Sequence, residues 1–321
     1  MDNKTIGSVI SSAPRFCGIT SFMRLPHTRD LNEVDVAIIG IPFDSDGAFR
    51  IGSRFAPESI RSQGKLCLRN YHIAHNIAPL EHIKVVDFGD SAVIPGSVER
   101  TYEVVECEVS PIFQEGVIPI ALGGDHSISL PLLRAAAKKY GKVALVHFDA
   151  HLDTGDVYYD EIKYTHGTQF RRAVEEGLVD TSKSIQVGMN GTIYPEMTRE
   201  YSETLGYKII TMDEAAALGS QMVANAILER TQGLPVFFSF DIDIMDVSVA
   251  PGSGAPEVGG YLTREMLQIL RALRDLNIIG VDIVEVNPLF DSGQITSILA
   301  ANIVFEFLAM IATRKRQRQP M

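Results

Sequence analysis

Short apolar runs alternate along this chain with longer stretches in which apolar residues recur every three to four positions. Runs that are apolar almost throughout are typical of strands buried on both faces of a parallel sheet, and the periodic stretches are typical of helices. The eight runs lie at residues 34–43, 83–90, 117–126, 142–151, 184–190, 207–214, 234–243 and 278–288. The main periodic stretches lie at residues 130–141, 213–233, 263–277 and 295–315. The pattern predicts an α/β fold in which helices cover both faces of a mainly parallel sheet.

The alternation continues through the chain without a linker, a low-complexity tract or an internal repeat, so we expect a single domain over residues 1–321. Residues 295–315 are apolar on nearly every side, which predicts a helix packed deep in the fold. No segment reaches the roughly 18 uninterrupted apolar residues of a membrane span. Residues 1–10 lack the basic and apolar regions of a signal peptide. We therefore expect no membrane partner.

Composition and charge narrow the choice of compartment and partner. The 321 residues are 45% hydrophobic and 21% charged, as in soluble globular proteins, and the formal net charge is −11. This charge argues against nucleic acid or an anionic membrane as the main partner. The three cysteines, Cys17, Cys67 and Cys107, are odd in number and share no Cys-x-x-Cys spacing, which favours free thiols in a reducing compartment. We expect a cytoplasmic protein.

Several of the predicted strands end in acidic or imidazole side chains. Ligands of open parallel sheets bind in the crevice at the carboxyl ends of the strands, so these groups are expected to converge there. The groups are Asp125 with His126, the segment Asp149 to Asp153, Asp241 with Asp243, and Glu285. The sequences Asp-x-His-x-Asp and Asp-x-Asp use the two-residue alternation of extended chain, which directs alternate side chains to one side.

Each cluster has an ordinary explanation when it is taken alone. The Gly-Gly-Asp-His segment at 123–126 can be a turn in which Asp125 caps the next helix. The segment that begins at Asp149 does not fit a calcium loop, because Thr154 replaces the required glycine and Asp160 the final glutamate. A second candidate loop, starting at Asp241, fails at Met245.

The clusters together predict a site for two divalent metal ions. Four carboxylates at neighbouring strand ends would repel one another and raise each other's pKa unless cations compensated them. Mixed carboxylate and imidazole ligands suit Mn²⁺, Ni²⁺, Fe²⁺, Co²⁺ or Zn²⁺, and the lack of a nearby cysteine argues against a structural zinc site. The candidate ligands are His126, Asp149, His151, Asp153, Asp241 and Asp243.

Five motifs in this order resemble the ureohydrolase family of arginases and agmatinases, and the resemblance extends from residue 40 to the last helix. The motifs are GGDHS at 123–127, DAHLDT at 149–154, THGT at 165–168, SFDIDIMD at 239–246 and EVNP at 285–288. The resemblance implies a three-layer α/β/α fold around a central, mainly parallel eight-stranded sheet, and a homotrimer or homohexamer. It also implies hydrolysis of a guanidino group to urea and an amine with two Mn²⁺ ions, or Ni²⁺ in some members.

The resemblance also assigns roles to the candidate ligands. One metal ion is expected on His126, Asp149, Asp153 and Asp241, and the other on Asp149, His151, Asp241 and Asp243. Asp149 and Asp241 would bridge the two ions, which lower the pKa of a shared water so that hydroxide exists near neutral pH. Asp153 would orient this hydroxide, which attacks the guanidinium carbon, and move its proton toward the leaving amine.

Two more residues are candidates for substrate contact. Glu285 is implied to hold the guanidinium through a directional, charge-assisted interaction, although a buried structural glutamate is the alternative. His166 is implied to contact the substrate or shuttle protons, since an imidazole titrates near neutrality; a plain loop histidine is the alternative. We leave His147 out of the site, on the expectation that strand alternation points it away from the ligands.

The substrate is less defined, because the loop after the Asp-x-His-x-Asp segment departs from that of arginases. It lacks the asparagine and serine residues that bind the amino-acid head of arginine, and it resembles the agmatinase branch. Its acidic residues Asp156, Asp160 and Glu161 disfavour free arginine and favour a cationic tail such as that of agmatine. Lys163, Arg171 and Arg172 lie nearby and can reverse that local charge.

Other departures leave further substrates open. Asn190 stands where the family usually has arginine, and residues 246–256 differ from the more common form. Neither change touches a metal ligand, so 4-guanidinobutanoate, 3-guanidinopropanoate and guanidine derivatives remain alternatives to agmatine. A noncatalytic partner subunit with this fold is an alternative of another class. A dinuclear amidohydrolase or deacetylase would not need the anionic Glu285.

Overall fold

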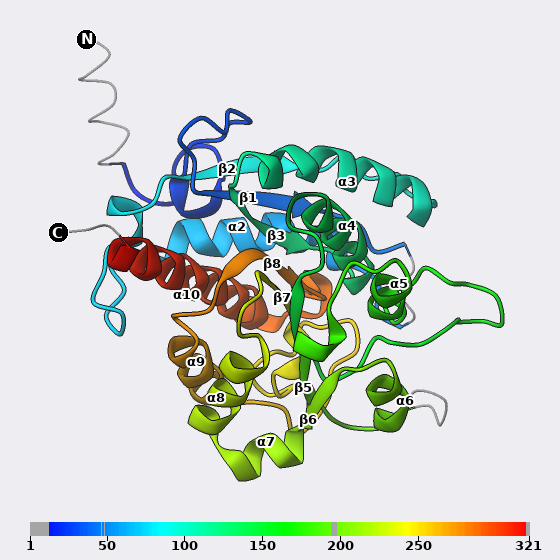
Figure 1. Cartoon of the computed structure of the whole chain (residues 1–321). Helices are drawn as coiled ribbons and strands as arrows, with labels where there is room; N and C mark the ends of the chain where they lie inside the picture. Colours follow the sequence, from blue (N-terminus) through cyan, green and yellow to red (C-terminus); the bar gives the residue numbers. More distant parts are fainter. Residues whose placement is uncertain (1–12, 46, 48, 194–197, 319–321) are drawn as a thin grey trace.

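The computed structural model describes residues 13–45, 47, 49–193 and 198–318. Residues 1–10, on which the expected absence of a signal peptide depends, lie outside this described part. Figure 1 shows the described chain arranged around one sheet, with helices on both sides.

Eight strands form the sheet in the order β2-β1-β3-β8-β7-β4-β5-β6, and every neighbouring pair is parallel. Each of the eight apolar runs contains one strand, so the predicted strands and the three-layer α/β/α fold are confirmed. The strands are β1 (Val36–Ile41), β2 (Val85–Asp90), β3 (Ile118–Gly123), β4 (Ala144–Phe148), β5 (Ile185–Met189), β6 (Lys208–Thr211), β7 (Val236–Asp241) and β8 (Ile278–Val284).

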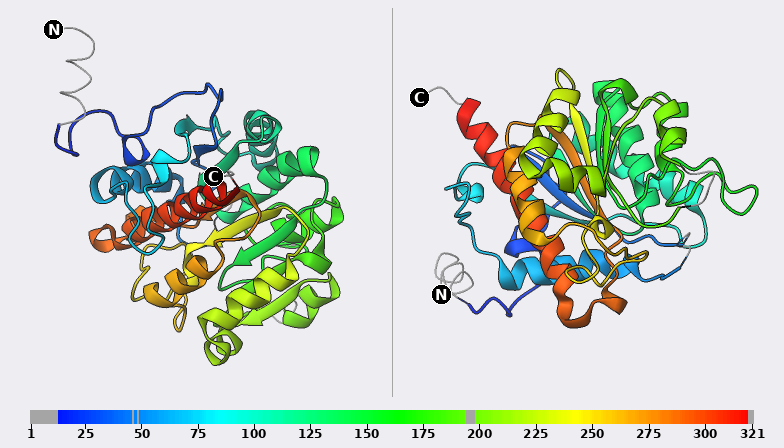
Figure 2. Two further views of the ribbon diagram at one scale, coloured as in Figure 1. Left: turned by 60° about the vertical axis from the view of Figure 1, so that its left-hand side comes forward. Right: turned by 90° about the horizontal axis from the view of Figure 1, so that it is seen from below.

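The described helices are α2 (Ala56–Cys67), α3 (Val98–Gln114), α4 (Ser129–Tyr140), α5 (Gln169–Glu175), α6 (Arg199–Thr204), α7 (Met212–Leu218), α8 (Ser220–Arg230), α9 (Thr263–Ala272) and α10 (Ile295–Arg318). Helices α2, α8, α9 and α10 pack on one face of the sheet, and α3, α4 and α5 on the other (Figures 1 and 2). Strand residues alternate between the two faces: in β1, Val36 and Ile38 join the first core, whereas Ala37 and Ile39 join the second. This double burial explains why the strands are apolar throughout.

One predicted helical stretch is divided into two helices, and another lies within a long helix that is mostly buried. The stretch at 213–233 forms two helices, because Gly219 between α7 and α8 has a φ of 76°, which ends the first helix. Helix α10 is long and apolar enough to cross a membrane by length and composition alone. However, 78% of its most apolar window is buried inside the fold, as expected for the predicted core helix.

The sheet order brings the candidate ligands together. Strands β3, β8, β7 and β4 are consecutive neighbours, and these are the strands followed by the clusters at 125–126, 285, 241–243 and 149–153. In the β7–β8 register Asp241 pairs with Val284, and in the β4–β7 register Phe148 pairs with Phe240. The four clusters therefore lie at one edge of the sheet, at its carboxyl ends, where ligands of such folds bind.

Candidate metal centre

The turn after β3 positions His126. Gly124 is required there, because a Cβ at this position would lie only 1.9 Å from the carbonyl oxygen of Phe43. The Asp125 side chain then accepts a hydrogen bond from the backbone N–H of Ser127 (3.0 Å) and caps the short helix that begins at His126. The turn and cap expected from the sequence are thus present, and they hold the His126 ring in the crevice.

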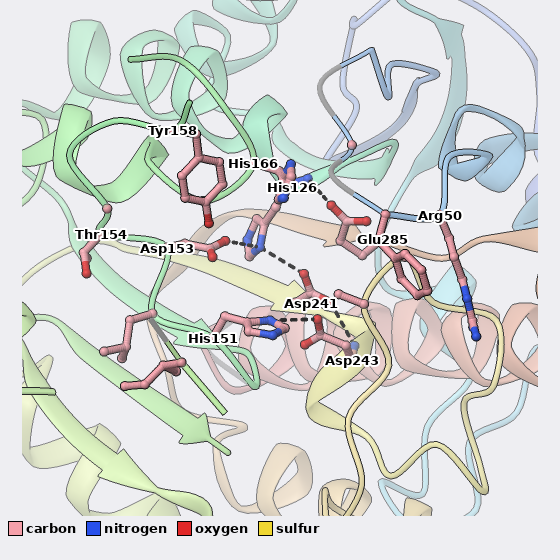
Figure 3. A pocket seen from close by; sticks show the side chains of 18 of the residues that line it. Arg50, His126, His151, Asp153, Thr154, Tyr158, His166, Asp241, Asp243 and Glu285 are labelled. Carbon is pink, nitrogen blue, oxygen red and sulfur yellow. Dashed lines mark hydrogen bonds and ion pairs between the residues drawn. The ribbon is translucent and has the colours of Figure 1, made fainter. Parts of the chain in front are cut away.

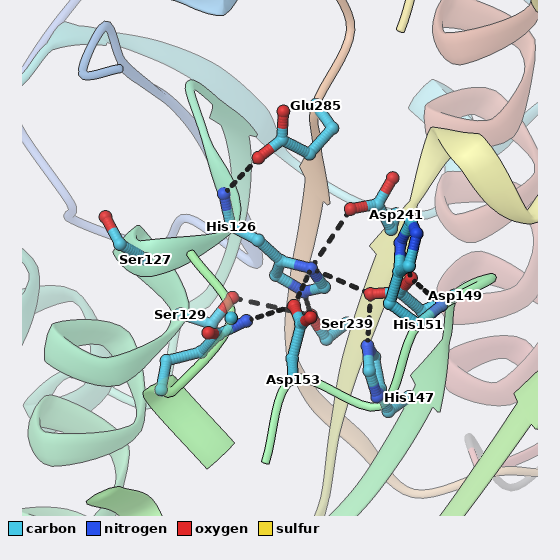
Figure 4. Close-up of polar contacts among 12 residues, drawn as sticks. His126, Ser127, Ser129, His147, Asp149, His151, Asp153, Ser239, Asp241 and Glu285 are labelled. Carbon is cyan, nitrogen blue, oxygen red and sulfur yellow. Dashed lines mark hydrogen bonds and ion pairs between the residues drawn. The ribbon is translucent and has the colours of Figure 1, made fainter. Parts of the chain in front are cut away.

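The imidazole of His126 lies among three carboxylates (Figure 4), two of which, those of Asp153 and Asp241, are also seen in Figure 3. Its Nδ1 atom is 3.0 Å from an oxygen of Asp149, 3.0 Å from an oxygen of Asp153 and 3.1 Å from an oxygen of Asp241. The Nδ1 atom is buried yet has no hydrogen bond of acceptable geometry. A buried nitrogen without a hydrogen bond, surrounded by anionic oxygens, suits a metal ligand.

The other ring nitrogen of His126 is held by a chain of buried groups. His126 Nε2 lies 2.8 Å from Ser239 Oγ, and Ser239 Oγ donates to Asp282 Oδ1 at 2.7 Å. Ser129 Oγ donates to the other oxygen of Asp282, also at 2.7 Å. With Ser239 donating to Asp282, it accepts from Nε2–H of His126. The lone pair of Nδ1 is then free for a cation.

A second group of ligands forms around His151. Its Nδ1 atom is 3.3 Å from Asp149 Oδ1 and 3.1 Å from Asp243 Oδ2. Asp149 thus presents one oxygen to His126 and the other to His151, as a bridging carboxylate would. Asp241 lies between the two groups and accepts a hydrogen bond from the backbone N–H of Asp243 through its Oδ1 (2.8 Å). All six ligands expected from the sequence meet in one crevice.

Electrostatics also favour bound cations. Asp149, Asp241 and Asp243 are each only 2% exposed. Burial, together with Asp243 and Asp149, raises the pKa of Asp241 well above its usual range. Burial and Asp149 raise the pKa of Asp243 to about 6. Burial alone would raise the pKa of Asp149, but His147, His126 and His151 hold it well below its usual range. Two divalent ions would remove this mutual repulsion, so the residues present fit the implied metals.

His147 belongs to this network, contrary to our expectation. Its Nε2 atom lies 2.8 Å from Asp149 Oδ2, and its Nδ1 atom lies 2.9 Å from the side-chain nitrogen of Gln186. The amide of Gln186 also donates to the carbonyl oxygen of Leu152 at 2.6 Å. Side chains two positions apart on a strand point to the same side, so His147 lies on the side of Asp149 and our expectation that it points away was wrong.

Glu285 and His166 line the same pocket as the candidate metal ligands (Figure 3). Glu285 Oε1 accepts a hydrogen bond from the backbone N–H of His126 at 2.9 Å. Burial, offset by His166 and reinforced by Asp125, raises the pKa of Glu285 to about 7. Glu285 and Asp153 have φ values of 62° and 54°, a left-handed conformation that is uncommon for residues other than glycine and concentrates at functional sites.

The acidic loop residues on which the expected cationic tail depended do not line this pocket. Asp156 pairs with Arg172 at 2.9 Å and with Arg171 at 3.2 Å. Asp160 and Glu161 are exposed at the tip of the loop, beside the bridge that joins Tyr158 to Ile162. Arg171 and Arg172 thus offset the negative charge of Asp156, on which the expected preference for a cationic tail partly depended.

Of the two departures from the family pattern, the segment 246–256 contributes to the pocket lining and Asn190 does not. Gly254 and Ala255, within the altered segment 246–256, line the pocket. Asn190 does not line it; its side chain donates to the carbonyl oxygen of Val258 at 2.6 Å. We therefore expect the segment with Gly254 and Ala255 to contribute to substrate selection, and Asn190 not to contact the substrate directly.

Comparisons with known proteins agree with this geometry. A sequence model described as the Arginase family matches residues 34–310. A guanidinobutyrase from Pseudomonas aeruginosa is 40% identical over 93% of this chain and 94% of its own length. A mitochondrial agmatinase from Gallus gallus is 38% identical over 92% of this chain and 86% of its own. The solved structure of proclavaminate amidinohydrolase from Streptomyces clavuligerus superposes with a TM-score of 0.89 at 37% identity, covering 94% of this chain and all of that one.

Proposed function

The chain belongs to the arginase family, and from that premise we propose that it hydrolyses the guanidino group of a small linear guanidino compound to urea and an amine. The observation that carries the proposal is the pocket itself. Three carboxylate oxygens surround His126 Nδ1 at its floor, and Glu285 lies in its wall. An amide substrate would have no cation for Glu285 to bind, which distinguishes this chemistry from that of an amidohydrolase.

Six side chains are proposed to hold two divalent ions, Mn²⁺ in the first place and Ni²⁺ as the alternative. The chemistry that such a bound pair supplies is a hydroxide nucleophile near neutral pH, since divalent ions lower the pKa of water. One ion is assigned to His126, Asp149, Asp153 and Asp241, and the other to Asp149, His151, Asp241 and Asp243.

The remaining steps are assigned to side chains of the pocket. Glu285 binds the guanidinium and fixes its plane against the floor of the pocket. Asp153, whose Oδ2 accepts a hydrogen bond from Gln169 Nε2 at 2.6 Å, orients the nucleophile and carries its proton toward the leaving amine. His166 lies in the pocket wall, where it contacts the substrate and can pass protons between the pocket and the solvent.

The reaction is tested by measuring urea released from arginine, agmatine, 4-guanidinobutanoate, 3-guanidinopropanoate, guanidine and small alkylguanidines after loading with Mn²⁺ or Ni²⁺. We expect at least one of these compounds to release urea at a catalytic rate, and arginine to be a poor substrate. The absence of urea from every compound with both metals would overturn the proposal and favour a noncatalytic subunit.

We further propose that residues 1–321 form one catalytic domain, that the protein is cytoplasmic, and that it forms a homotrimer or homohexamer. One continuous sheet and a family match over residues 34–310 support the single domain, and three free cysteines suit a reducing compartment. The oligomer is what the resemblance to the ureohydrolase family implies. Light scattering coupled to size-exclusion chromatography measures the molar mass directly. A mass of one chain would contradict the oligomer.

A further inference from the structure

The charged residues of the pocket fall into two groups. The floor holds the acidic metal ligands, and Glu285 stands beside them. In the described part of the pocket lining, no other Asp or Glu is present, and Arg50 is the only lysine or arginine. Figure 3 places Arg50 beyond Glu285, on the side away from His151 and Asp153. A substrate held by Glu285 therefore has one lysine or arginine side chain in the described lining for its tail.

The environment of Arg50 holds its side chain without neutralising it. The Arg50 guanidinium lies 5.3 Å from the ring centre of Phe49 and 4.8 Å from that of Phe290. Its backbone carbonyl accepts a hydrogen bond from Asn287 Nδ2 at 3.0 Å, which ties the residue to the segment after Glu285. Contacts with two aromatic rings stabilise a guanidinium and leave its N–H groups available to an anion.

Neighbouring arginines differ from Arg50 because carboxylates already pair with them. Arg54 pairs with Asp44, and Arg61 pairs with Asp87 at 2.9 Å. For Arg50, in contrast, no ion pair with any carboxylate in the described ranges is found. Its positive charge is thus available at the pocket.

In the described pocket lining, a positively charged tail meets no carboxylate besides the candidate metal ligands and Glu285, and Glu257, outside the lining, lies 3.8 Å from His151 Nε2. A substrate ammonium would need a carboxylate in the outer pocket, but the nearby Asp156 is paired with Arg171 and Arg172 outside it. An ammonium would instead approach the like charge of Arg50, which disfavours binding. A carboxylate would meet a planar guanidinium that can bind it through two parallel hydrogen bonds.

We propose that Arg50 forms an anion-binding subsite for the substrate tail, so that the substrate is a guanidino acid. The inference rests on the proposed function, because it assigns the tail of the molecule whose guanidino group is hydrolysed. It replaces the cationic tail that the sequence of the 154–168 loop favoured. Phe49, Ile193 and Ala255 provide apolar surface for the methylene groups between the two charges.

The test compares three compounds with similar chains and different tail charges: 4-guanidinobutanoate, butylguanidine and agmatine. We expect the wild-type protein to prefer 4-guanidinobutanoate, with its anionic tail, over butylguanidine, with its uncharged tail. It should in turn prefer butylguanidine over agmatine, with its cationic tail. Arg50→Gln should lower the ratio of kcat/KM for the acid to that for butylguanidine by about ten- to a hundredfold, the effect of losing one charge-assisted hydrogen-bonded pair. Most of the change should appear in KM, since the tail does not react.

Two control variants separate the subsite from general effects. Arg50→Lys retains the charge without the planar guanidinium and should restore part of the ratio. Arg100→Gln removes an exposed arginine of α3 outside the pocket and should leave the ratio unchanged. Circular dichroism of each variant checks its folding.

The outcomes distinguish the two proposals. Urea release in which agmatine is the best of the three would overturn the anion subsite and leave the hydrolase intact. The subsite is also overturned if Arg50→Gln lowers the rates for all three compounds equally, because Arg50 would then support only the structure. If none of the three compounds releases urea but arginine or guanidine does, the subsite is overturned and the hydrolase stands. If no compound of the full panel releases urea with either metal, the proposed function fails, and the subsite assigned to its substrate fails with it.

Discussion

Replacing Glu285 by glutamine separates guanidinium binding from metal binding. The two side chains have nearly the same shape, and glutamine keeps an oxygen that can accept the 2.9 Å hydrogen bond from the backbone N–H of His126. The space for the side chain is also fixed, because a Cβ on Gly254 would lie 2.6 Å from Glu285 Oε2. The substitution therefore removes the negative charge and little else.

The size of the effect follows from leaving a cation without its partner. Loss of one member of a buried ion pair costs about 3–5 kcal/mol. At about 1.4 kcal/mol for each factor of ten, kcat/KM should fall by roughly a hundredfold to a few thousandfold. The variant should still hold two metal ions, because Glu285 is not among the six proposed ligands.

Steady-state urea release and elemental analysis measure the two quantities on the same preparation. Glu229→Gln makes the same substitution at an exposed position on α8 and serves as the matched control. Normal turnover by Glu285→Gln would refute the role of this carboxylate. Loss of metal from the variant would show instead that Glu285 supports the metal centre.

Three further substitutions test the metal centre, its supporting contacts and the stability of the fold. Asp149→Asn removes a proposed bridging charge, so less than two ions per chain and loss of most urea release are expected, as measured by elemental analysis and the urea assay. His147→Asn removes the 2.8 Å contact with Asp149 and should weaken metal affinity about 10- to 100-fold in a competition titration with a chelator. Glu306→Gln should lower the free energy of unfolding by about 1–3 kcal/mol near neutral pH, because His72, His75 and Arg271 lose their shared carboxylate. Burial alone would raise the pKa of Glu306, but these three partners hold it below its usual range. The stabilisation therefore exists above about pH 4.3 and is lost as the pH falls through the folded-state pKa. Thermal unfolding of the wild-type protein and the variant against pH should show their difference in stability shrinking in acid.

The sheet and the convergence of the candidate metal ligands were predictable because their signals are local. A strand buried on both faces must be apolar throughout, and all eight such runs became strands. Charged residues that directly follow parallel strands must lie at the carboxyl edge of the sheet. Asp282 carries a further local signal, because a carboxylate in the middle of a buried strand needs buried partners, and Ser239 and Ser129 donate to it.

The features that sequence reasoning missed depend on contacts between distant segments. Asp156 was expected to favour a cationic tail, but it pairs with Arg171 and Arg172 and does not line the pocket. Arg50 precedes the first candidate metal ligand, His126, by more than seventy positions, and no local pattern relates it to the pocket. The division between α7 and α8 depended on the left-handed conformation of Gly219, which glycine permits but does not require.

The dinuclear centre is the central claim, and the metal content of active enzyme tests it most directly. Protein loaded with Mn²⁺, freed of excess ion and assayed for urea release with its preferred guanidino compound should contain two ions per chain by elemental analysis. Activity should fall in step with their removal by a chelator and return when the ions are restored. Full activity in a preparation that holds one ion per chain or fewer would contradict the assignment of the six ligands to two metals.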